Sequence, residues 1–85
     1  MLDPILQSEL ADTVRSIARI PAGVPISPES RLVEDLGIDS LDLVSIVLTA
    51  QELYGVAIDE DEVAELRTMA DLTVYVDRRR NAAAA

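Results

Sequence analysis

A proline-containing segment most restricts what this chain can fold into. Pro21, Pro25 and Pro28 exclude a continuous helix there, although helical patterns lie on both sides. Residues 21–38 are therefore predicted to form a long connection between two helices. We expect this connection to pack back onto a core, because its later part contains the apolar residues Leu32, Val33, Leu36 and Ile38. Long ordered connections are often functional.

The helix before this connection is marked by a local start signal. Asp3 followed by Pro4 is typical of an N-cap and the first helical position. The helix is expected to end just before Pro21. Apolar residues recur along it with helical spacing and predict one buried face, made of Leu6, Leu10, Val14 and Ile17.

The second predicted helix runs from about Ser40 to Tyr54, with Asp39 at its N-cap and Gly55 as its terminator. We assign one broad face to the core: Leu43, Ile46, Val47, Ala50 and Leu53. The same helix has a second apolar flank, and a small bundle cannot easily surround a helix on all sides. We therefore expect this flank to be partly exposed and to bind partner proteins. This flank consists of Leu41, Val44 and Leu48. The alternative is that the long connection or a neighbouring short helix covers it.

Two further helices follow. A short one is expected after Asp59, and a last one from about Met69 to Arg80, opened by Thr68. Residues 81–85 are expected to fray. No strand pattern of comparable strength is present, so the predicted fold class is all-α: a small bundle of three main helices and one short helix. Residues 1–85 form one domain, with its core between about 3 and 80.

The charge of the chain is concentrated in its middle. The 85 residues carry a net charge of −9, and residues 29–66 hold eleven acids against the single base Arg31. Such a field opposes nucleic acid and anionic membranes and favours basic protein partners. No secretory signal or apolar run of membrane-spanning length is visible in the sequence. We therefore expect a cytoplasmic monomer.

The side chains available for catalysis are few. The chain contains no His, Cys or Lys, so a nucleophilic serine would lack a base, and no catalytic residue is predicted. Ser40 is still the leading candidate for covalent chemistry carried out by another enzyme. A phosphodiester on its hydroxyl would lie at a helix N-terminus, which favours an anion.

One segment resembles the prosthetic-group attachment motif of acyl carrier proteins: Leu36-Gly37-Ile38-Asp39-Ser40-Leu41-Asp42. The similarity covers roughly residues 10–78. It implies that a phosphopantetheinyl transferase attaches 4′-phosphopantetheine to Ser40, using coenzyme A and Mg²⁺, with Asp39 helping to position the metal. No resident metal is implied. The arm would then carry acyl or aminoacyl groups as thioesters.

The resemblance also identifies partners and a docking surface. We expect loading ligases, synthases and transferases with basic patches to bind a surface made of Leu41, Asp42, Val44, Leu48, Glu52, Asp59 and Glu60. Asp42 after the motif resembles stand-alone acyl carriers, and such a carrier would serve fatty acid, specialised lipid or polyketide biosynthesis. Ser45 and Gln51 stand where the family often has Glu, which weakens the case for a housekeeping fatty-acid carrier and favours a dedicated carrier for a special lipid, a polyketide or an amino acid. An aminoacyl or peptidyl carrier and an unmodified acidic interaction module are the alternatives. Calcium sensing by residues 59–65 is disfavoured, because the segment lacks the spacing of an EF-hand.

Overall fold

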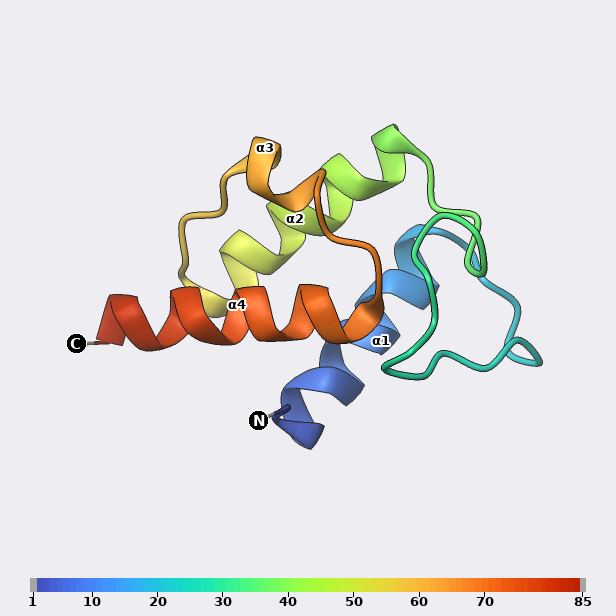
Figure 1. Cartoon of the computed structure of the whole chain (residues 1–85), viewed down its shortest axis with the longest axis horizontal. Coiled ribbons are helices and arrows are strands. Elements are labelled where there is room, and N and C mark those ends of the chain that lie inside the picture. The colour runs from blue at the N-terminus through green and yellow to red at the C-terminus, as the bar shows by residue number, and fades with distance from the viewer. Residues whose placement is uncertain (1, 85) are drawn as a thin grey trace.

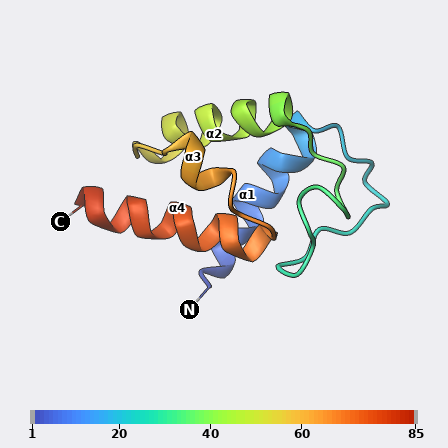
Figure 2. The ribbon, with the colours of Figure 1, turned by 45° about the horizontal axis from the view of Figure 1, so that its top comes forward.

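The computed structural model describes residues 2–84 and contains the helices α1 (Pro4–Ile17), α2 (Ser40–Tyr54), α3 (Glu60–Val63) and α4 (Met69–Ala84). Figure 1 shows that α1 leads into the long connection and that α2 follows it. The last helix, α4, lies across the bundle from α2. In Figure 2, α3 lies between α2 and α4. The predicted all-α bundle of three main helices and one short helix is confirmed.

Local capping signals set the beginnings of the helices. The Asp3 carboxylate accepts the main-chain N–H groups of Ile5 at 2.9 Å and Leu6 at 3.3 Å. Before α4, the Thr68 hydroxyl accepts the N–H of Asp71 at 3.1 Å, while the Asp71 carboxylate accepts the N–H of Thr68 at 3.2 Å. This reciprocal pair is a capping box. The starts of these helices could therefore be read from the sequence.

The ends of the helices agree less uniformly with the sequence. Gly55 ends α2 in the left-handed conformation, with φ 63°, as predicted. The first helix was predicted to end just before Pro21 but ends at Ile17. After this end, Arg19 adopts φ 55° and Ile20 donates its N–H to the carbonyl of Arg15. The last helix continues to Ala84, so the predicted end at Arg80 is wrong. Alanines have the highest helix propensity, which explains the extension. Ala85 lies outside the described residues.

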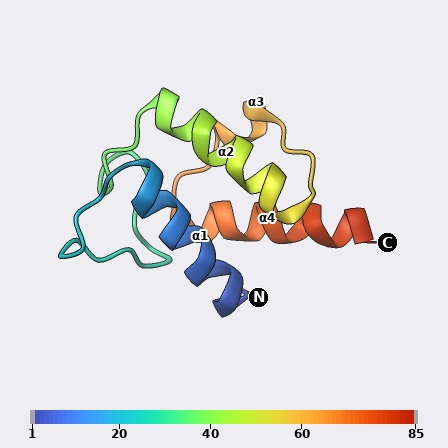
Figure 3. The same cartoon turned by 180° about the vertical axis from the view of Figure 1, so that it is seen from behind.

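The core lies where α1 packs against both α2 and α4, and in the rear view of Figure 3 α1 lies in front, next to these two helices. One face of α1 is fully buried, and it packs with apolar residues of α2 and α4 and of the connections. The principal members are Leu6, Leu10, Val14, Ile46, Met69, Leu72 and Val76. Ile17 is only partly buried at the edge of this cluster.

The long connection between α1 and α2 is tied to the start of α4. Leu32 donates its N–H to the carbonyl of Arg67 at 2.8 Å, and Met69 donates to the carbonyl of Ser30 at 3.0 Å. Leu32, Leu36 and Ile38 are buried, which confirms that the connection packs on the core. Val33 is the exception, since 64% of it is exposed.

Candidate functional site

Ser40 is the first residue of α2 and its side chain is exposed. The preceding residue, Asp39, has extended backbone angles and is the N-cap: its Oδ1 accepts the N–H of Asp42 at 2.8 Å. The cap therefore belongs to Asp39, as the sequence predicted, and the Ser40 hydroxyl is not needed for it. An exposed hydroxyl at a helix start is accessible to an external enzyme.

The chain enters this helix in a fixed conformation. Ile38 is buried and donates its N–H to the carbonyl of Leu32 at 3.0 Å. Gly37 adopts φ 66°, a conformation in which a side chain would be strained although the space around it is open. A turn closed by Arg31 and Asp35 precedes it, and the N–H of Arg31 holds the pKa of the Asp35 carboxyl below its ordinary value, with help from the guanidinium. Ser40 is therefore presented by an ordered segment on both sides.

The predicted apolar flank of α2 is exposed. Leu41 is 79% exposed, Leu48 50% and Val44 39%. The alternative, that neighbouring elements cover the flank, holds only in part for Val44, which also lines a cleft towards α3. Leu53, which was assigned to the core face, is 60% exposed, so that assignment is wrong. The rest of the face is buried or half-buried: Leu43, Ile46, Val47 and Ala50.

Acidic side chains surround this flank. Glu52 near the end of α2 is exposed, as are Asp59 and Glu60 at the start of α3, and Asp42 is half-buried. The structure thus brings the acidic start of α3 to the side of α2 on which Ser40 and Val44 lie. Among the described residues, no group of three or more acidic side chains is arranged to hold a metal ion.

A cleft between α2 and α3 opens beside Ser40. Its volume is about 230 Å³, and it is lined by Ser40, Leu43, Val44, Val47, Glu60, Asp61, Val63 and Ala64. Neither this cleft nor its lining residues from α3, apart from Glu60, are predicted by the sequence. Ile58 and Val63 have the spacing of a hydrophobic staple around an N-cap at Asp59. This pattern predicts a short helix but does not predict where that helix packs.

None of the helices in the described part of the chain is long and apolar enough to cross a lipid bilayer.

Comparisons with known proteins agree on one family. The model of the family described as "Phosphopantetheine attachment site" matches residues 8–76. The acyl carrier protein of Thermobifida fusca is 39% identical over 69 residues, covering 81% of this chain and 86% of that relative. The meromycolate extension acyl carrier protein of Mycobacterium bovis is 35% identical over 78 residues, covering 88% and 68% of the two chains.

Solved structures support the same fold. A Mycobacterium tuberculosis protein described as an acyl carrier protein superposes with a TM-score of 0.77 at 26% identity, covering 86% of this chain and 96% of that one. The acyl carrier protein of Thermotoga maritima gives a TM-score of 0.72 at 22% identity, covering 94% and 96%.

Proposed function

This chain belongs to the phosphopantetheine-binding family of acyl carrier proteins, and we propose that Ser40 is the serine to which its 4′-phosphopantetheine is attached. The observation that carries the proposal is the exposed position of Ser40 at the start of α2, with the capping role already taken by Asp39. Members of this family are carriers rather than enzymes, which fits a chain without His, Cys or Lys.

The surroundings of Ser40 fit the attached group. The first turn of α2 presents main-chain N–H groups and the positive end of the helix dipole, which stabilise a phosphodiester. When attached, the group supplies a terminal thiol that holds cargo as a thioester. We propose that the cleft between α2 and α3 shelters part of that cargo, since Leu43, Val47 and Val63 give it an apolar lining directly beside Ser40.

Asp39 has two roles in this proposal. It caps α2 through the N–H of Asp42 and thereby fixes the backbone on which Ser40 is presented. Its carboxylate is also exposed beside the serine, where it can help to position Mg²⁺ in the complex with the phosphopantetheinyl transferase. The family resemblance supports the second role.

The docking surface for partner enzymes is the exposed flank of α2 with its acidic surroundings. Large apolar side chains exposed in this way give a partner area to bury, worth roughly 1.5–3 kcal/mol for each side chain fully covered. Acidic groups around the flank favour basic patches on the partner and speed association. We assign to this surface Leu41, Asp42, Val44, Leu48, Glu52, Asp59 and Glu60. The transferase, a loading ligase and synthases would use it in turn.

We infer that the cargo is an acyl intermediate of fatty acid or specialised lipid biosynthesis. The relatives named above are acyl carriers, and one of them is named for meromycolate extension. Their names favour acyl cargo over the aminoacyl or peptidyl cargo of the alternative interpretation.

The test is enzymatic modification of the native chain. Purified protein is incubated with coenzyme A, Mg²⁺ and a phosphopantetheinyl transferase of broad specificity, and the intact mass is measured. We expect one added phosphopantetheine on the native chain and none on Ser40→Ala, with the Ser45→Ala variant modified normally as the control. Modification of Ser40→Ala would contradict the assignment of the site, and an unmodified native chain would contradict the function.

A further inference from the structure

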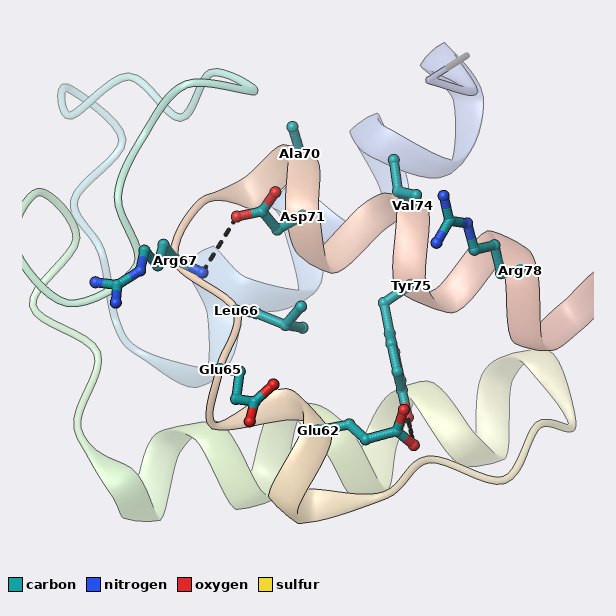
Figure 4. A pocket seen from close by; sticks show the side chains of 9 residues that line it. All are labelled: Glu62, Glu65, Leu66, Arg67, Ala70, Asp71, Val74, Tyr75 and Arg78. Carbon is teal, nitrogen blue, oxygen red and sulfur yellow. Dashed lines mark hydrogen bonds between the residues drawn. The ribbon is translucent and has the colours of Figure 1, made fainter.

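The short helix α3 is fastened to α4 by side chains. The main-chain N–H of Asp59 donates to the Tyr75 hydroxyl oxygen at 3.1 Å, and that hydroxyl donates to Oε1 of Glu62 at 3.2 Å. Tyr75 therefore contacts both the N-cap of α3 and a residue within α3. Figure 4 shows the Tyr75 side chain extending from α4 towards Glu62.

Arg79 completes this attachment. Its guanidinium forms an ion pair with the Glu62 carboxylate and lies over the Tyr75 ring, 5.2 Å from the ring centroid. Arg79 and Tyr75 are one helical turn apart on α4, so both reach the same carboxylate. We call Tyr75, Arg79 and Glu62 the latch.

Little else joins α3 to α4 on this side. A hollow of about 620 Å³ lies between α4 and the segment that leads from α3 into it, bordered by Glu65, Leu66, Val74 and Arg78. The buried anchor of α3 is the single residue Val63. Because a helix of four residues is not stable by itself, its position depends on such contacts.

The opposite side of α3 forms a wall of the cleft beside Ser40. Glu60, Asp61, Val63 and Ala64 line that cleft, and Leu43, Val44 and Val47 of α2 face them. Glu62, the residue held by the latch, lies between these lining residues in the sequence. Because Glu62 and these lining residues belong to one four-residue helix and the residue after it, a displacement of α3 away from α4 would change the width of the cleft.

We propose that Tyr75 and Arg79 are positioning residues: through Glu62 they hold α3 in place and so set how closely the cleft shelters cargo carried on Ser40. The part of this proposal that concerns cargo rests on the proposed function, whereas the latch itself acts in the unmodified protein. Tyr75 lines no part of the cleft, so its effect on cargo is transmitted through α3.

The latch is tested by amide hydrogen exchange in the unmodified chain. Tyr75→Phe removes both hydroxyl contacts and keeps the ring, and Arg79→Gln removes the ion pair. Tyr54→Phe is the matched control, because Tyr54 also donates to a glutamate, Glu9, at 3.2 Å and has an arginine over its ring, but it lies away from α3. We expect exchange in residues 60–66 to rise about three- to tenfold in both latch variants and not in the control, as for the loss of one ordinary, solvent-accessible hydrogen bond.

The effect on cargo is tested with an octanoyl thioester on the phosphopantetheine of the same three variants. The rate at which a small external thiol displaces the octanoyl group is measured. We expect displacement to be faster in Tyr75→Phe and Arg79→Gln than in wild type and Tyr54→Phe, after all variants are shown to be folded by circular dichroism. Unchanged exchange in residues 60–66, or unchanged displacement despite faster exchange, would overturn the proposal. A chain that accepts no phosphopantetheine would instead refute the proposed function, while the exchange measurement would still decide whether the latch exists.

Discussion

The Asp39 carboxylate accepts the main-chain N–H of Asp42 at 2.8 Å, across the residue that is proposed to be modified. This bond satisfies an otherwise unpaired donor in the first turn of α2 without using the Ser40 hydroxyl. The same carboxylate is expected to be needed by the transferase. Substitutions at Asp39 can therefore separate its role in capping α2 from its role in the modification of Ser40.

Asp39→Asn is expected to keep the cap, because asparagine is as good an N-cap as aspartate. Asp39→Ala is expected to lower the free energy of unfolding by about 0.5–2 kcal/mol, measured by urea denaturation. Both variants lose the carboxylate, so both should be modified more slowly by the transferase. Normal modification of Asp39→Asn would show that the charge is not used and that Asp39 acts only as a cap.

The proposed docking surface predicts that alanine substitutions at two exposed leucines of α2 affect the KM of the transferase differently. Leu48 is 50% exposed on the flank and Leu53 is 60% exposed outside it. Leu48→Ala is expected to raise the KM of the transferase about fivefold or more, as for an interface residue worth more than 1 kcal/mol. Leu53→Ala is the control and should leave KM unchanged. Both should leave the melting temperature nearly unchanged, and equal KM values for the two variants would contradict the assignment of the flank.

The starts of the helices and the end of α2 were predictable because caps are local. Asp39 and Gly55 act on N–H and carbonyl groups within four residues of themselves, so the sequence around them contains the whole signal. The exposed hydroxyl of Ser40 follows from the same local geometry. The flank of α2 was also predictable, since helical spacing places Leu41, Val44 and Leu48 together regardless of what packs elsewhere.

The remaining features depend on contacts between distant segments. Spacing assigned Leu53 to the core, but at that position it borders an open hollow with the polar residues Glu9, Asp12 and Thr13 of α1 and stays exposed. The cleft beside Ser40 exists because α3 lies against α2, and α3 is held there partly by Tyr75 on α4. No periodicity in the sequence contains that information, because Tyr75 and Glu62 are brought together only by tertiary packing.

Gln7 and Thr73 form a buried polar pair in the core. We expect the effects of substituting these two residues on the free energy of unfolding to be strongly non-additive. The Thr73 hydroxyl lies 2.6 Å from Oε1 of Gln7 and 2.9 Å from the carbonyl of Met69, and Nε2 of Gln7 has no partner among the described residues. Only one of the two polar atoms of the Gln7 amide faces the Thr73 hydroxyl, so the other stays unpaired in either orientation of the amide. Such an atom costs about 1–3 kcal/mol.

Thr73→Val should therefore lower the free energy of unfolding by about 1–3 kcal/mol, because it leaves the Gln7 amide buried without its partner. The double variant Gln7→Met, Thr73→Val replaces both polar groups by apolar groups of similar volume, and it should be at least as stable as wild type. Urea denaturation of the four proteins of the double-mutant cycle measures the coupling. Additive losses would show that the pair is not an isolated polar defect in the core.

The raised pKa of Tyr54 predicts that the protein loses stability at alkaline pH. Partial burial, and then the neighbouring carboxylate of Glu9, raise the pKa of Tyr54 from the ordinary 10.0 to about 12. Below pH 10 the phenol keeps its proton in both the folded and the unfolded chain. Between about pH 10 and 12 mainly the unfolded chain releases it, so the free energy of unfolding should fall as the pH rises through this window.

The measurement uses Tyr75→Phe, which leaves Tyr54 as the only tyrosine. Tyrosinate absorbance of the folded protein should then rise with a midpoint near pH 12 rather than 10. Adding Tyr54→Phe should flatten the dependence of urea stability on pH across the same window, since the group whose pKa differs between the two states is gone. A midpoint near 10 in the folded protein would mean that neither burial nor Glu9 acts on Tyr54, and the contact between α1 and the end of α2 would then be looser than the hydrogen bond between Tyr54 and Glu9 implies.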